Sequence, residues 1–208
     1  MDLVQSIALA GGMAWASGMR LYAVVFAAGM LGRMGYLELP ATLRVLENPW
    51  LIGIAGTLLV IEFLADKIPL VDSAWDSVQT FIRVPAGALL AALAMGEHPP
   101  ELMLAAGLLG GSLTAATHVA KAGSRALINT SPEPFSNVAT SLGEDVLVAS
   151  GLYTAIAHPL TFLILLGVFL LLLLWLLPKL VRGVRLVFGR IFGRPRPSRP
   201  PLPPPASS

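Results

Sequence analysis

Residues 160–177 read LTFLILLGVFLLLLLWLL, an apolar run of 18 residues without one charged side chain. A run of this length is enough to cross the hydrocarbon core of a bilayer as a single α-helix. The run ends at Pro178 and Lys179, where a spanning helix is expected to reach the polar headgroups. We therefore expect a transmembrane helix that faces lipid here, and we assign it no chemistry.

The rest of the chain shares this apolar character. Hydrophobic residues make up 55% of the 208 residues and charged residues only 12%, against roughly 25% charged residues in soluble domains. Lipid must therefore be the solvent, and the sequence predicts an all-α, polytopic transmembrane helix bundle of about six or seven spans. Six further apolar segments lie at about 3–17, 20–34, 49–66, 74–95, 101–127 and 136–157.

Two features leave the helix boundaries open. The first two segments have only about 15 residues each and are separated by Ser17-Gly18-Met19-Arg20, which fits two short spans, a re-entrant pair or one interrupted helix. Pro85 lies inside the fourth segment, where it kinks the helix or marks the helix start. The other boundaries coincide with turn-forming proline pairs at Leu39-Pro40, Asn48-Pro49, Ile68-Pro69, His98-Pro99-Pro100 and Ser131-Pro132-Glu133-Pro134.

The loops are too short for a separate soluble domain. We divide the chain into a transmembrane domain at 1–178, a basic interfacial segment at 179–193 and a disordered Pro-rich tail at 194–208. The basic segment either binds anionic lipid or acts as a plain topology anchor. No Lys or Arg precedes the first apolar run, so we expect that run to be retained and not cleaved as a signal peptide.

The distribution of charge orients the chain. No acidic residue follows Asp145, whereas seven Lys and Arg residues follow the last apolar run, which places the C-terminus in the cytoplasm. With seven spans, Arg20, Lys67 and the pair Lys121 and Arg125 then lie on the cytoplasmic side as well.

Ionisable side chains inside a span cost several kcal/mol unless they are paired or wetted, so each suggests a function. Glu62 and Asp66 are four residues apart and share one helix face. Asp72 and Asp76 repeat that spacing, and Arg83 follows two turns later on the same face. Another segment carries His118, Lys121 and Arg125 at spacings of three and four, and the next carries Asn137, Ser141, Glu144 and Asp145.

These residues are expected to meet in the cytoplasmic half of the membrane. They form either a static ion-pair network that fixes helix register or a water-filled cavity that handles an ion, a proton or a small polar solute. Glu62, Asp66 and Glu144 would then select charge or carry protons, and His118 would relay them. The candidate binding residues are Arg20, Glu62, Asp66, Lys67, Asp72, Asp76, Arg83, His118, Lys121, Arg125, Asn129, Asn137, Glu144 and Asp145.

Several other functions find little support. The chain has no cysteine, which excludes disulfides and thiolate chemistry. It contains no HExxH, GxSxG or phosphate-loop motif, so we expect no enzyme, no cofactor and no nucleic-acid partner. Glu62 and Asp66 are hard oxygen donors for a metal such as magnesium, but their spacing is unspecific and the metal stays unknown.

The chain contains a weak internal echo. Gly11-Gly12 followed by Gly18-Met19-Arg20 is repeated as Gly110-Gly111 followed by Gly123-Ser124-Arg125. A duplicated ancestor is one explanation, with the repeats inverted in the membrane if an odd number of spans separates them. Chance similarity between glycine-rich helices is the other explanation.

The charged motifs in combination resemble a bacterial membrane protein family called domain of unknown function 4126. The resemblance covers about residues 5–160 and is carried by EFLADKIP at 62–69, RVPAG at 83–87, HVAKAGSR at 118–125, NTSPEPFSN at 129–137 and SLGED at 141–145. It implies a membrane location and a shared charged core, without an assigned activity. From the charged residues inside the spans we expect a bacterial inner-membrane protein that is transporter- or channel-like, with a non-catalytic scaffold or assembly factor as the alternative.

Overall fold

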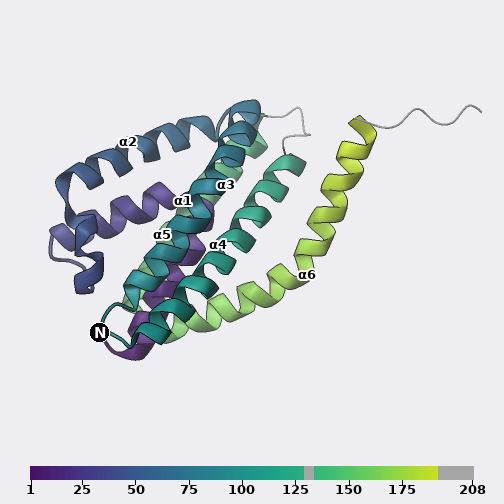
Figure 1. Cartoon of the computed structure of the whole chain (residues 1–208). Coiled ribbons are helices and arrows are strands. Elements are labelled where there is room, and N and C mark those ends of the chain that lie inside the picture. The colour runs from purple at the N-terminus through teal and green to yellow at the C-terminus, as the bar shows by residue number, and fades with distance from the viewer. Residues whose placement is uncertain (129–133, 192–208) are drawn as a thin grey trace, which may run out of the picture.

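The computed structural model describes residues 1–128 and 134–191, and this part of the chain is almost entirely helical (Figure 1). It contains no strand within those ranges. The expected all-α helical bundle is therefore confirmed. The elements are α1 (Leu3–Arg33), the 3-10 helix η1 (Ala41–Glu47), α2 (Pro49–Ala65), α3 (Pro69–Ala94), α4 (Pro100–Ile128), α5 (Pro134–Ala157) and α6 (Pro159–Ile191).

Proline sets the start of every α-helix after the first. Each of these five helices has proline as its first residue, where the missing N–H is not needed and the fixed φ already suits a helix. The side chain of Asn48 caps α2 by accepting a hydrogen bond of 2.9 Å from the backbone N–H of Trp50. The boundaries expected at Pro49, Pro69, Pro100 and Pro134 are thus confirmed, whereas α3 continues through Pro85.

The first two apolar segments form one interrupted helix. Arg20 has φ −145° and ψ 72°, so α1 loses its helical backbone at that residue. Figure 1 shows the consequence, because the second half of α1 bends away from the bundle and projects together with α2. The structure places the interruption at Arg20, between the two apolar segments.

The helices are compatible with a membrane protein. Four of them, α1, α3, α4 and α6, are long and apolar enough to cross a membrane, and a fifth span arises if η1 and α2, which meet at 66°, count as one. This is fewer than the seven apolar segments of the sequence. Large apolar side chains are widely exposed, as for Phe81 at 82% and Leu109 at 72%, which suits contact with lipid.

The helices α1, α3 and α4 pack closely through small residues. A Cβ on Gly18 would approach the backbone of Thr114 and the side chain of Thr117, and one on Gly110 would clash with Ala91. The hydroxyl of Thr114 donates to the carbonyl of Ala14 at 2.8 Å. Small residues and hydroxyl bonds of this kind allow helix backbones to approach in a membrane.

The helices α1 and α4 begin at the same end of the bundle. The N-terminal amine of Met1 lies 3.2 Å from Glu97, and His98 bonds Ser6 at 2.9 Å, just before α4 starts. At the other end, Arg20 and Arg125 reach the same carboxylate, that of Asp66. The two glycine–arginine blocks of the internal echo therefore run in the same direction, and the relation between them is parallel and not inverted.

Candidate functional site

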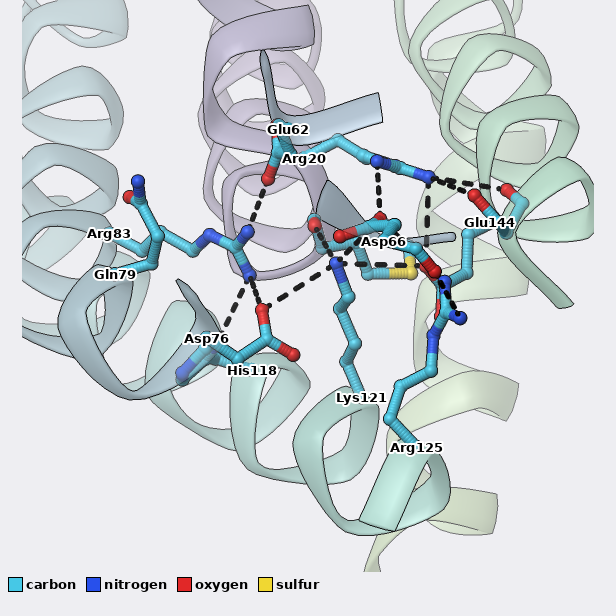
Figure 2. A network of polar contacts seen from close by, with 12 residues as sticks. Arg20, Glu62, Asp66, Asp76, Gln79, Arg83, His118, Lys121, Arg125 and Glu144 are labelled. Atoms are coloured by element: carbon cyan, nitrogen blue, oxygen red, sulfur yellow. Dashed lines mark hydrogen bonds and ion pairs between the residues drawn. The ribbon is translucent and has the colours of Figure 1, made fainter. Parts of the chain in front are cut away.

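Charged side chains from five helices meet inside the bundle (Figure 2). We call this set the charged cluster. The cations Arg20, Arg83, Lys121 and Arg125 are all at least 96% buried, and so are the carboxylates Glu62, Asp66 and Asp76. The sequence predicted this convergence, because the ten members that the structure describes were all among its candidates: Arg20, Glu62, Asp66, Asp76, Arg83, His118, Lys121, Arg125, Glu144 and Asp145.

Asp66 is the hub of one half of the cluster. Its Oδ2 lies 2.5 Å from Arg20 Nη1, 3.5 Å from Lys121 Nζ and 3.6 Å from Arg125 Nη2. Asp66 occupies this place because it is the C-cap residue of α2, directly after Ala65. The break in α1 at Arg20 lies next to it. Three cations around one carboxylate oxygen offset the large cost of burying that charge.

The α5 carboxylates close this half of the cluster. Arg125 donates two hydrogen bonds to Glu144, each of 3.0 Å, in the fork geometry that suits a guanidinium. Asp145 Oδ1 lies 2.9 Å from Arg20 Nε. Arg20 also donates to the hydroxyl of Ser141 at 3.0 Å. The non-helical residue Arg20 is thus held by α2 and α5 together.

Arg83 organises the other half of the cluster. Its guanidinium pairs with Glu62 on α2, lies 3.0 Å from Asp76 Oδ1, and bonds His118 Nδ1 at 3.1 Å. Figure 2 shows Arg83 between these three partners. Lys121 joins the two halves, because its Nζ lies 3.7 Å from Asp76 as well as 3.5 Å from Asp66.

The contacts of His118 define which ring nitrogen carries its proton. Arg83 has only donors, so Nδ1 of His118 accepts its hydrogen bond and bears no proton. The other nitrogen, Nε2, lies 2.7 Å from the hydroxyl of Thr80, and that hydroxyl donates to the backbone carbonyl of Asp76 at 3.0 Å. Nε2 must therefore donate, and His118 is neutral in this arrangement.

The charges of the cluster are nearly balanced. Among the described residues, four cations (Arg20, Arg83, Lys121 and Arg125) face five carboxylates (Glu62, Asp66, Asp76, Glu144 and Asp145), and Lys67 at the edge adds a fifth cation, attracted by Asp145. Within the same residues, the buried atoms Glu62 Oε2 and Asp76 Oδ2 have no hydrogen-bond partner. Buried carboxylate oxygens without a partner are places where a proton or a cation can bind.

Some expected site residues lie elsewhere. Lys67 sits at the edge of the cluster, with Nζ 3.0 Å from the centre of the Phe63 ring. Asn129 lies outside the described residues, and so do the side chains of Asp72 and Asn137.

Sequence reasoning missed three polar residues beside the cluster. Thr80 bonds His118, and Gln79 is paired with Tyr22 through a hydrogen bond of 2.9 Å. Gln79 and Thr80 lie three and four residues after Asp76, so they share its helix face. This spacing could have revealed them in the sequence.

Of the two cavities that lie between the helices around the cluster, one reaches its charged side chains. A crevice of about 380 Å³ lies between α1, α2 and α5 and is lined by Arg20 and Asp145 together with apolar side chains. A larger cavity of about 590 Å³, bordered by α1, α3, α4 and α6, has no charged lining residue. Within the described ranges, no three His, Asp or Glu residues are placed to hold a metal ion.

A family model described as Domain of unknown function (DUF4126) matches residues 7–179. The match covers the whole charged cluster and confirms the resemblance drawn from the sequence motifs. No curated protein and no solved structure matches the chain.

Proposed function

The chain belongs to the DUF4126 family, and from this premise and the geometry of the charged cluster we propose that it is a transporter-like membrane protein. It would move an ion or a small polar solute past the cluster, and protons would pass along the same path. The observation that carries the proposal is a pair of buried carboxylate oxygens, Glu62 Oε2 and Asp76 Oδ2, that lack a hydrogen-bond partner among the described residues.

Stability alone is a weak reason for such a cluster. Replacing a buried ion pair with apolar residues of similar volume is often neutral or stabilising, because desolvation offsets the attraction between the charges. A set of nine buried or half-buried charges is therefore an expensive way to hold helices together. Charged side chains inside a membrane more often mark a pathway for ions or protons than a purely structural contact.

The break in α1 supports the same proposal. Transporters commonly place their sites at interrupted helices, where backbone and side chains can rearrange. Arg20 is such an interruption, and its side chain bridges Asp66 and Asp145, which come from different helices. Protonation of one of these carboxylates would remove an ion pair and weaken the contact of α1 with that helix.

The paired state then corresponds to a closed gate. Glu62, Asp66 and Arg83 have no exposed surface, so a solute can pass only after these pairs separate. Proton uptake by Glu62 would lower the cost of separation, because a neutral carboxyl no longer holds Arg83 as strongly. Coupling between protonation and opening follows from this arrangement.

Proton flux into liposomes tests the proposal. Purified protein is reconstituted with a pH-sensitive dye inside, and a potential of known size drives proton entry. We expect flux above that of empty liposomes, and a loss of most of it in Glu62→Gln. Glu97→Gln is the matched control, because Glu97 lies at the other end of the bundle beside the N-terminus. Flux equal to that of empty liposomes, or flux unchanged by Glu62→Gln, would refute proton coupling.

A non-catalytic scaffold is the second candidate. Every charged side chain of the cluster has an ion-pair or hydrogen-bond partner, as a purely structural network requires. The basic segment at 179–193 would then bind anionic lipid or a partner protein. This candidate predicts that the wild type carries no flux while Glu62→Gln still destabilises the fold.

The location is proposed on the basis of charge distribution. The excess of Lys and Arg after the last apolar run, residues 160–177, favours a bacterial inner membrane with the C-terminus in the cytoplasm. A C-terminal fusion to green fluorescent protein, which folds only in the cytoplasm, and one to alkaline phosphatase, which is active only outside, test this orientation.

A further inference from the structure

The crevice beside α1 offers a binding site of mixed character. Its volume of about 380 Å³ falls in the range of small-molecule sites. Eight of its ten lining residues are apolar, among them Phe63 on α2 and Leu152 on α5, and the other two are Arg20 and Asp145. An occupant would therefore be largely apolar and carry one polar group at the end that meets the charged cluster.

The charged group that the crevice exposes is a carboxylate, that of Asp145, and its ion-pair partner Arg20 lies buried behind it at 2.9 Å. The side chain of Asp145 is 32% exposed, whereas that of Arg20 is fully buried. Arg20 is also committed to Asp66 at 2.5 Å and to the hydroxyl of Ser141 at 3.0 Å. A ligand that enters the crevice therefore meets a carboxylate, which attracts a cation and repels an anionic headgroup.

An ammonium group lies over Phe63, one of the residues that line the crevice. Lys67 Nζ sits 3.0 Å from the centre of the Phe63 ring and donates to the carbonyl of the same residue at 3.1 Å. The carboxylate of Asp145 attracts this ammonium as well. A ring face and a carboxylate are the two groups that most favour an organic cation over a neutral molecule. The Lys67 side chain thus shows that Phe63 and Asp145, two of the residues that line the crevice, favour a positively charged group.

We propose that the crevice binds an amphiphilic organic cation, with its apolar body between α2 and α5 and its positive centre near Asp145 and Phe63. The ligand would displace the ammonium of Lys67, which acts as a tethered competitor. This inference names the class of ion that the proposed function would transport, and transport of that ion rests on the proposed function. Binding of the ion in the crevice does not require transport.

Equilibrium dialysis of purified protein in a neutral detergent tests the site. The probes are tetraphenylphosphonium and tetraphenylborate, which share shape and apolar surface and differ in the sign of their charge. Protein-free micelles give the background. We expect saturable binding of tetraphenylphosphonium and none of tetraphenylborate above background.

Two substitutions give opposite expected effects. Asp145→Asn should weaken tetraphenylphosphonium binding by about tenfold or more, the size of one ionic contact partly shielded from water. Lys67→Gln should strengthen it several-fold, because the competing ammonium is gone. A loss of fold would weaken binding in both variants, so a gain in Lys67→Gln cannot come from misfolding. Glu97→Gln serves as the control and should bind as the wild type does.

The outcomes separate this inference from the proposed function. Selective cation binding with both effects supports the site even if liposomes show no proton flux, in which case only the transport proposal fails. Equal binding of the two probes, or an affinity that Asp145→Asn leaves unchanged, overturns the site whatever the flux assay shows.

Discussion

Removal of the Arg83 guanidinium should strongly destabilise the protein. Arg83 is fully buried and pairs with Glu62 and with Asp76 at 3.0 Å. In Arg83→Met, Asp76 keeps Lys121 at 3.7 Å, whereas Glu62 loses the cation with which the structure pairs it. Breaking a buried pair in this way costs about 3–5 kcal/mol, because it leaves an uncompensated charge in the interior.

A second substitution should restore part of the lost stability. Glu62→Gln alone is expected to cost about 1–3 kcal/mol, since Arg83 keeps its contacts with Asp76 and His118. Combined with Arg83→Met, it removes the isolated charge, so the double variant should be more stable than the sum of the two single effects by about 2 kcal/mol.

Unfolding by sodium dodecyl sulfate in mixed micelles, followed by tryptophan fluorescence, measures these differences. Arg33→Met is the matched control, because Arg33 is exposed at the end of α1 and should leave stability unchanged. A cost below about 1 kcal/mol for Arg83→Met, or strict additivity in the double variant, would show that water or a rearranged neighbour stabilises Glu62 and would refute the reasoning.

Three further predictions test the packing and chemistry of the cluster. Gly18→Leu should destabilise the fold by about 1–3 kcal/mol in the same unfolding assay, because its side chain meets the backbone of Thr114; a neutral effect would contradict the close packing of α1 and α4. Nitrogen-15 spectra of His118 should show the proton on Nε2 and a bare Nδ1, and the opposite tautomer would exclude the hydrogen bond from Arg83. Because the chain has no cysteine, a single introduced cysteine can be labelled selectively. Asp145→Cys should react with a water-soluble maleimide much faster than Ser141→Cys, because Asp145 is partly exposed and Ser141 is buried. Equal reaction rates would mean that water fills the cluster.

Local sequence features were sufficient for the helical fold. An apolar run long enough to cross a bilayer is recognisable without knowledge of its neighbours, as residues 160–177 show. Proline at the start of a helix also acts through its own backbone, so the starts of α2 to α5 could be placed in advance. Glu62, Arg83 and Arg125 could be picked out as special from the sequence alone, because a charged side chain inside a membrane span costs several kcal/mol of free energy.

The sequence determined by itself that the chain is an all-α bundle rich in apolar helices, and which ionisable residues are out of place in it. Only the tertiary structure decided that α1 is interrupted at Arg20, that Arg20 and Arg125 approach from parallel helices, and that Asp145 is the carboxylate open to a crevice. The reason is that helix formation depends on neighbours within a few residues, whereas each ion pair joins side chains on different helices. Which oxygen meets which guanidinium is therefore fixed only when the helices have packed.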